Sequence, residues 1–160
     1  MSDVVLRPAV AGDAGMVLAW RNDPWIVALS AERKTVEPVE HAVWFESVLD
    51  QTRHLLYIVQ MGGEPAGTVR LDRAGEQAIV TIFLMQRFTG RGVGVAALEA
   101  VCRQAADRWP EVRTITARIR RDNHASQKAF MKAGFTLVST VAEEPRIVVM
   151  QRRNAVRVAA

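Results

Sequence analysis

The chain has 160 residues, of which 49% are hydrophobic and 24% charged, and its formal net charge is +4. These values fit one globular domain over residues 1–160 with a sizeable core. The single cysteine, Cys102, excludes an intrachain disulfide and a cysteine-based zinc site, and its helical neighbours predict a buried core thiol.

The start of the chain has neither a basic region nor a long apolar run, and no apolar stretch approaches the roughly 20 residues of a membrane span. We therefore expect a cytoplasmic protein with no membrane partner. The mild positive charge suits anionic ligands. The basic residues are scattered apart from two arginine groups, and aromatic residues make up only 6%, so we expect no nucleic-acid partner.

The first third of the chain predicts one strand and three helices, joined by short loops. The strand is expected at 4–8 and the helices at 14–21, 24–29 and 38–50. Asp13 is the expected N-cap of the first helix, and Pro38 suits the first turn of the third. The third helix has apolar residues at helical spacing. These are Val39, Ala42, Val43, Phe45, Val48 and Leu49.

The rest of the chain predicts strands interleaved with two helices. Strands are expected at 54–61, 65–72, 77–85, 112–120, 135–141 and 145–151, and helices at 92–108 and 125–133. Gly62 and Gly63 mark a hairpin, and Gly134 suits the residue after a helix end. This order predicts an α+β sheet flanked by helices.

One stretch predicts a phosphate site: a strand near 79–84, then glycines, then a helix. Gly90, Gly92 and Gly94 let successive backbone N–H groups converge without Cβ clashes. The helix N-terminus adds partial positive charge and unpaired donors, and Arg91 adds a full charge. We therefore expect a phosphorylated cofactor.

Three other interpretations of this glycine turn are less well supported by the sequence. No lysine follows the glycines, which disfavours a nucleoside triphosphate loop. Gly92, Gly94 and Ala97 match a dinucleotide fingerprint, but too few residues follow for the βα units that such a domain needs. A tight turn without a ligand is disfavoured by its three glycines.

The segment from Thr89 to Gly94 resembles the cofactor motif [Q/R]-x-x-G-x-[G/A] of the GNAT superfamily of acyl-CoA N-acyltransferases, with Thr89 at its first position. Residues 122–135, DNHASQKAFMKAGF, resemble the family's N-x-x-S-x-x-x-[Y/F]-x-K-x-G-F segment. The two matches lie in the family's order and at its spacing, and the first residues of the chain also resemble many members. The resemblance implies a mixed, mostly antiparallel sheet of about seven strands, flanked by helices. It also implies direct transfer of an acetyl group from acetyl-CoA to a primary amine.

A finer resemblance concerns the acceptor. Trp20-Arg21-Asn22, Glu40-His41-x-x-Trp44 and Val69-Arg70-Leu71-Asp72 resemble bacterial acetyltransferases that act on nucleotide-linked 4-amino sugars, with the pseudaminic-acid pathway enzyme as the nearest type. Enzymes that acetylate ribosomal-protein N-termini share parts of the pattern. The implied acceptor is therefore a small-molecule amine, first a nucleotide sugar, and alternatively a protein N-terminus or a polyamine-like amine. A homodimer is common among such relatives.

The resemblance also implies a cofactor site. Backbone groups of Phe83, Leu84 and Met85 would pair with the pantetheine arm and polarise the thioester carbonyl. Asn123 would reach the arm, and Lys132 the nucleotide end. Ser126 and Phe130 lie on the same short segment. The diphosphate would meet backbone N–H groups of the glycine turn, from Thr89, Gly90, Arg91, Gly92, Val93 and Gly94.

The sequence leaves open which residues act as general acid and general base. Many members have a tyrosine where Phe130 stands, as general acid. Either Ser126 replaces it or no acid is needed, because a thiol with a pKa near ~8.5 leaves as the anion. We prefer the second option; a non-catalytic acyl-CoA-binding module, which would bind acyl-CoA or RNA, is the alternative.

The acceptor amine must lose a proton, and His41 is the first candidate base because an unperturbed histidine titrates near ~6.5. Glu40 is the second. Arg21, Asn22, His41 and Arg70 are candidates for binding an anionic substrate. No metal site is expected.

Overall fold

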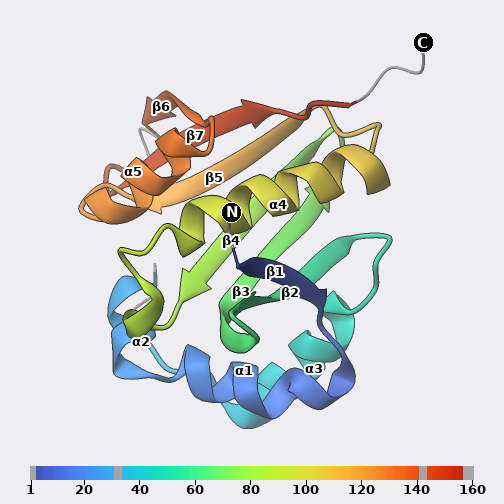
Figure 1. The fold of residues 1–160 in the computed structure, drawn as a ribbon, viewed down its shortest axis with the longest axis vertical. Helices are drawn as coiled ribbons and strands as arrows, with labels where there is room; N and C mark the ends of the chain where they lie inside the picture. Colours follow the sequence, from blue (N-terminus) through green and yellow to red (C-terminus); the bar gives the residue numbers. More distant parts are fainter. Residues whose placement is uncertain (1–2, 31–33, 141–143, 157–160) are drawn as a thin grey trace.

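The computed structural model describes residues 3–30, 34–140 and 144–156. They form one seven-stranded sheet in the order β1-β2-β3-β4-β5-β7-β6 (Figure 1). The pairs β1–β2, β2–β3 and β3–β4 are antiparallel, β4–β5 is parallel, and β5–β7 and β6–β7 are antiparallel. The predicted mixed, mostly antiparallel sheet is confirmed. Its strands are β1 (Val4–Pro8), β2 (His54–Met61), β3 (Glu64–Ala74), β4 (Gln77–Leu84), β5 (Thr114–Arg120), β6 (Thr136–Thr140) and β7 (Ile147–Arg153).

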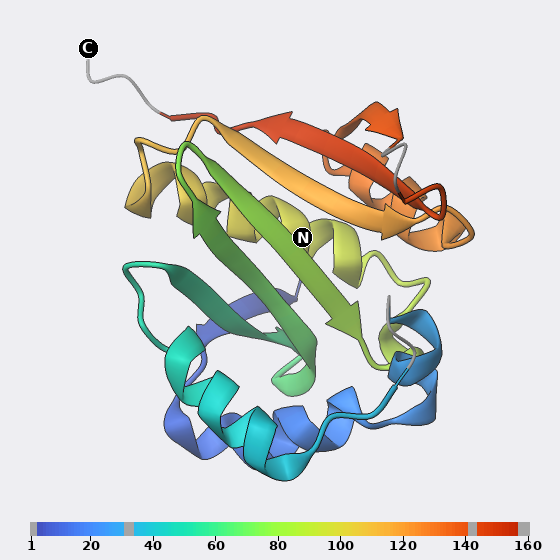
Figure 2. The ribbon, with the colours of Figure 1, turned by 180° about the vertical axis from the view of Figure 1, so that it is seen from behind.

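In the described part of the chain, five α-helices and two short 3₁₀ turns flank the sheet. The helices are α1 (Ala14–Arg21), α2 (Pro24–Leu29), α3 (Pro38–Val48), α4 (Val93–Arg108) and α5 (His124–Lys132), and the 3₁₀ turns are η1 (Ala11–Asp13) and η2 (Gln86–Phe88). α4 crosses one face of the sheet (Figure 1). On the other face α1 and α3 lie near β2 and β3, and no described helix lies in front of β4, β5 and β7 (Figure 2). Among the described residues, no helix is long and apolar enough to cross a membrane.

The two faces of the sheet bury two separate cores because successive side chains of a strand point to opposite sides. Ile115, Ala117 and Ile119 of β5 lie in the core beneath α4, as their alternation predicts. Leu56 and Ile58 of β2 belong instead to the smaller core under α1 and α3. This second core holds in place the helices that lie near the C-terminal end of β4.

The structure corrects the prediction for α3. Phe45 and Val48 are buried as expected, but Val39 and Val43 are 77% and 68% exposed, and Ala42 is exposed too. Among the described elements, this helix packs mainly against α1 and β2, so it buries a narrower face than its apolar residues suggest.

Asp13 is the N-cap residue of α1, as predicted, but its side chain does not cap the helix. Its carboxylate makes no cap hydrogen bond to α1. The oxygens accept hydrogen bonds from Arg7 Nη1 and Nη2, both at 3.0 Å, and from the Val10 N–H at 2.8 Å. The reason is the unexpected turn η1, which places Asp13 at the end of a preceding helical turn. The hydrogen bonds from Arg7 lower the pKa of Asp13 below its usual range.

Candidate active site

A gap opens between β4 and β5. The two parallel strands pair only from Gln77 to Ile79 on β4 and from Thr114 to Thr116 on β5. Both strands continue for several residues beyond that pairing, to Leu84 and Arg120. Figure 2 shows them diverging, so the last part of β4 has a backbone edge that no described strand pairs with.

The free edge of β4 presents specific backbone groups to this gap. The Met85 N–H donates to the Ala66 carbonyl at 2.8 Å, so the backbone of Met85 faces β3. Because the backbone groups of a strand alternate in direction, those of Phe83 also face β3, while those of Ile82 and Leu84 face the gap. Of the backbone groups expected to hold the pantetheine arm, those of Leu84 are the ones that point into the gap.

Gly67 of β3 makes this arrangement possible, although no sequence motif marks it. A Cβ at this position would lie 2.1 Å from the Phe83 carbonyl oxygen and 2.9 Å from Leu84 Cα. Only glycine allows such a close approach of the two backbones. The available signal was a glycine inside a predicted strand, which often marks a bulge or a close backbone contact.

The glycine turn has the conformation expected of an anion site. Gly90 and Gly92 have φ angles of 73° and 78°, in the left-handed region that glycine adopts without strain. Gly92 is the N-cap of α4, and the first N–H groups of a helix have no intrahelical acceptor. Gly94 lies close to the Leu84 side chain, since a Cβ there would be 3.6 Å from Leu84 Cδ1. The helix N-terminus and the free strand edge are therefore adjacent.

Two cationic side chains lie near this helix N-terminus. Arg91, Gly92 and Lys132 line one surface depression, whose other lining residues include the acidic Asp3 and Glu99. The sequence separates Arg91 and Lys132 widely, and the packing of α5 beside α4 brings them to the same hollow. Backbone N–H groups with two nearby cations form a surface suited to a diphosphate and a nucleotide.

The other residues expected to bind the cofactor make contacts with neighbouring protein groups. Asn123 is the N-cap of α5, and its Oδ1 accepts the Ser126 N–H at 3.1 Å. The Thr89 hydroxyl donates to the Gln86 carbonyl at 2.7 Å. The side chains of Val93 and Phe130 are 1% and 3% exposed and belong to the core beneath α4.

His41 lies in the small core. Its side chain is 3% exposed, and its ring is stacked against Phe45 with centroids 5.7 Å apart. Its Nε2 is buried with no hydrogen-bond partner among the described residues. Burial, with a smaller contribution from the charge of Arg21, lowers the pKa of His41 below its usual value. The ring is therefore neutral at pH 7 but enclosed, whereas its neighbour Glu40 is exposed.

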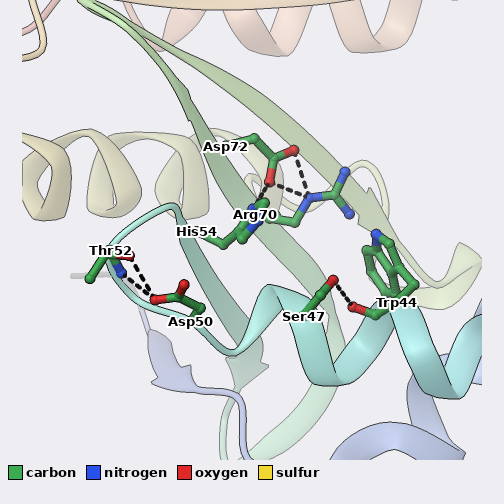
Figure 3. A network of polar contacts seen from close by, with 7 residues as sticks. All are labelled: Trp44, Ser47, Asp50, Thr52, His54, Arg70 and Asp72. Atoms are coloured by element: carbon green, nitrogen blue, oxygen red, sulfur yellow. Dashed lines mark hydrogen bonds and ion pairs between the residues drawn. The ribbon is translucent and has the colours of Figure 1, made fainter.

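The groups expected to bind an anionic substrate already have protein partners. The Asn22 amide donates to the Val36 carbonyl at 3.0 Å and accepts the Val36 N–H at 2.6 Å. Arg70 Nε donates to both oxygens of Asp72, at 3.0 and 2.9 Å, and Asp72 also meets His54 Nδ1 at 2.7 Å (Figure 3). The Arg70 guanidinium lies 5.0 Å from the Trp44 ring centroid. These contacts make Asn22 and Arg70 part of the framework around α3.

Two other reactive groups lie outside the site. Cys102 is 3% exposed, and burial raises its pKa to about 11, so the predicted core thiol is confirmed. Tyr57 is 5% exposed on the α4 side of the sheet, and its hydroxyl donates to Gln104 Oε1 at 3.3 Å. Burial raises the pKa of Tyr57 as well. The only tyrosine therefore supplies no acid at the gap.

Aromatic residues from α1 and α2 lie beside the end of β4, a position that the sequence did not predict for them. The Trp20 and Phe83 rings meet edge to face with centroids 6.2 Å apart. Trp25 Nε1 donates to the Leu84 carbonyl at 3.4 Å. Both contacts join residues about 60 positions apart, so no local pattern signals them.

The architecture is shared with known acetyltransferases. The family described as acetyltransferase (GNAT) domain matches residues 3–136. Aminoglycoside acetyltransferase AAC(6')-Ib in complex with coenzyme A superposes with a TM-score of 0.80 at 23% identity, covering 94% of each chain. Spermidine N-acetyltransferase from Vibrio cholerae, in complex with CoA and spermine, gives 0.81 at 14% identity and 96% coverage of each chain. The ribosomal L7/L12 alpha-N-protein acetyltransferase RimL with coenzyme A gives 0.80 at 19% identity, covering 96% of this chain and 95% of that one. No curated protein matches the sequence significantly.

Proposed function

The chain belongs to the acetyltransferase (GNAT) family and is an acetyl-CoA-dependent N-acetyltransferase, and we propose that it acetylates a primary amine by direct attack at the gap between β4 and β5. In this reaction the neutral amine nitrogen forms a bond to the thioester carbonyl carbon. The carbon–sulfur bond breaks, the thiolate leaves, and the attacking nitrogen loses a proton.

One observation carries the placement: the Leu84 N–H and carbonyl face the gap where β4 has separated from β5. An extended pantetheine arm can add to this edge as another strand would, because the edge offers a donor and an acceptor side by side. A backbone N–H held in this way would also polarise a thioester carbonyl.

The other end of the cofactor suits the α4 N-terminus. The first N–H groups of the helix, the turn at Gly90 and Gly92, and Arg91 would hold the diphosphate. Lys132 would contact the nucleotide end from the same depression. The Asn123 amide would reach the pantetheine from the start of α5, while its Oδ1 caps the helix.

In this proposal, no buried side chain accepts the amine proton, and none protonates the leaving thiolate. Burial lowers the pKa of His41, and the ring is enclosed against Phe45, so we assign the amine proton to water. Phe130 is not a proton donor, and the thiolate leaves as the anion because its thiol has a pKa near ~8.5. Ser126 remains the alternative donor, since its side chain is only partly buried.

For the acceptor we propose an amine that carries an anionic group, with a nucleotide-linked amino sugar first. The chain has a net charge of +4, which disfavours a polycationic amine. Arg118 and Arg120 stand on the part of β5 that borders the gap, where they pair with Glu144 and Asp122. A protein N-terminus is the second candidate because it supplies a primary amine in an extended chain.

Calorimetry with coenzyme A and acetyl-CoA, followed by an assay of thiol release, tests this function. The acceptor panel contains a nucleotide-linked 4-amino sugar, a peptide with a free N-terminus, spermidine and kanamycin. We expect tight binding of both cofactors and release that depends on the amino sugar. Binding without release from any amine would favour a non-catalytic acyl-CoA-binding module, and absence of binding would contradict the site.

A further inference from the structure

Helix α2 contacts the far ends of both diverging strands. At its first turn, Trp25 Nε1 donates to the Leu84 carbonyl of β4 at 3.4 Å. At its last turn, the Ala28 carbonyl accepts a hydrogen bond from Arg120 Nη1 of β5 at 2.9 Å. Leu84 and Arg120 both lie beyond the last paired residues of their strands, Ile79 and Thr116. The six-residue helix therefore spans the place where the strands are no longer joined to each other.

The surroundings hold both contacts in position. Ile26 is 2% exposed and seats α2 on the protein, while Asp23 caps its N-terminus by accepting the Trp25 N–H at 2.9 Å. The Arg120 side chain is 14% exposed, and its Nη2 donates to Asp122 at 2.6 Å, which orients the guanidinium. Both views place α2 next to the C-terminal end of β4 (Figures 1 and 2).

The contact of Trp25 has a specific chemical consequence. The peptide group between Leu84 and Met85 donates its N–H to the Ala66 carbonyl at 2.8 Å, and its carbonyl accepts the Trp25 indole N–H. Two hydrogen bonds, one on each side of β4, therefore fix the orientation of this peptide plane. A carbonyl oxygen has two lone pairs, so it can accept a second donor from a ligand in the gap.

We propose that α2 is a strap across the open end of the gap, and that Trp25 and Arg120 are positioning residues for acetyl transfer. Arg120 fixes the strap to β5, and Trp25 fixes the orientation of the Leu84 carbonyl that meets the pantetheine arm. This inference rests on the proposed function, because that function gives the Leu84 edge its ligand.

The first experiment needs no ligand and measures hydrogen exchange of the α2 amides. In Arg120→Gln we expect the Val27 and Ser30 amides to exchange about fivefold faster, the change expected for losing one hydrogen bond that restrains the helix end. Arg120→Lys keeps a charged donor and is the matched control, with exchange close to that of the wild type. Equal exchange rates in the wild type, Arg120→Gln and Arg120→Lys would overturn the proposal that Arg120 fixes α2 to β5.

The second experiment follows the indole N–H resonances during titration with coenzyme A, with Trp25→Phe assigning the Trp25 signal. We expect the Trp25 resonance to shift as the cofactor saturates, and the resonance of Trp109, buried at the far end of α4, to stay in place. A stationary Trp25 signal at proven saturation would overturn its positioning role. If calorimetry shows no coenzyme A binding, the proposed function fails, while the exchange experiment still decides whether α2 is a strap.

Discussion

Phe135 donates its backbone N–H to the Phe130 carbonyl at 3.0 Å, and the two rings meet edge to face with centroids 4.9 Å apart. The Gly134 N–H donates to the Met131 carbonyl at 3.0 Å. Together these contacts form a helix-ending motif in which the residue after the glycine packs on the last turn of the helix. Phe130, at the position of the family's usual tyrosine, therefore has a packing role at the end of α5.

This packing predicts the result of Phe130→Tyr. We expect the affinity for coenzyme A to stay within about threefold, because the ring remains in the core beneath α4. Placing a hydroxyl in this site costs about 1 kcal/mol of unfolding free energy unless it finds a partner. Calorimetry and urea unfolding measure the two quantities. A large loss of affinity would show that the ring packs directly on the pantetheine arm, and a large gain in kcat would show that the reaction uses an acid.

Gly92→Asp tests the diphosphate site. The φ angle of 78° is one that aspartate and asparagine tolerate better than most residues, and the position has open space around it. We expect Gly92→Asp to weaken coenzyme A binding at least about tenfold, through repulsion between the carboxylate and the diphosphate.

Gly92→Asn is the matched control, since it has the same shape without the charge. Calorimetry should place its affinity within about threefold of the wild type. Similar affinities for the aspartate and asparagine variants, both folded, would falsify the placement of the diphosphate at this turn.

Gly67→Ala tests the close approach of β3 and β4. The added methyl would overlap the Phe83 carbonyl oxygen, so the backbones must separate. We expect a loss of about 3 kcal/mol in the free energy of unfolding, measured in urea, and weaker coenzyme A binding because the Leu84 edge moves.

Gly75→Ala is the control for this variant. Gly75 has a φ angle of 63°, but a Cβ there meets nothing within 4 Å. Only the left-handed strain of about 1 kcal/mol should appear. Equal losses in the two variants would mean that backbone strain, and not the contact with Phe83, explains the cost.

His41 predicts a pH dependence of stability. Because burial lowers the pKa of His41 in the folded state, the unfolded state binds the proton more tightly. The stability is fully present above the unfolded pKa of about 6.5 and is lost as the pH falls through the lower folded pKa. We expect thermal unfolding to become easier between about pH 7 and pH 5.

His41→Phe should remove this acid sensitivity. It should also stabilise the protein at neutral pH by about 1 kcal/mol, because an apolar ring beside Phe45 replaces a buried nitrogen that has no hydrogen-bond partner among the described residues. His124→Gln, at an exposed position, is the control and should keep the wild-type pH profile. Loss of thiol release in a well-folded His41→Phe variant would instead support His41 as the base.

The elements and the glycine turn follow from local sequence. Strand alternation, helical spacing and the glycines at 90 and 92 depend on neighbouring residues, and the structure places α4 and the sheet close to where these patterns predict them. The family resemblance implied that the strand ending at Leu84 splays from the next strand, but it did not give the last parallel pair of β4 and β5, Ile79 with Thr116. The end of this pairing depends on how the long connection between the two strands, which contains α4, packs against the sheet.

The side-chain partners could not be read from the sequence for a related reason. Asn22 contacts Val36, Arg70 contacts Asp72, which also contacts His54, and His41 packs into the core beneath α1, so these expected substrate-binding residues already have partners within the protein. Trp25 and Arg120 had no motif to mark them, yet they contact the two ends of the gap. Local patterns record backbone preferences over a few residues. The partners of a side chain depend on segments tens of residues away, which meet it only after the sheet has formed.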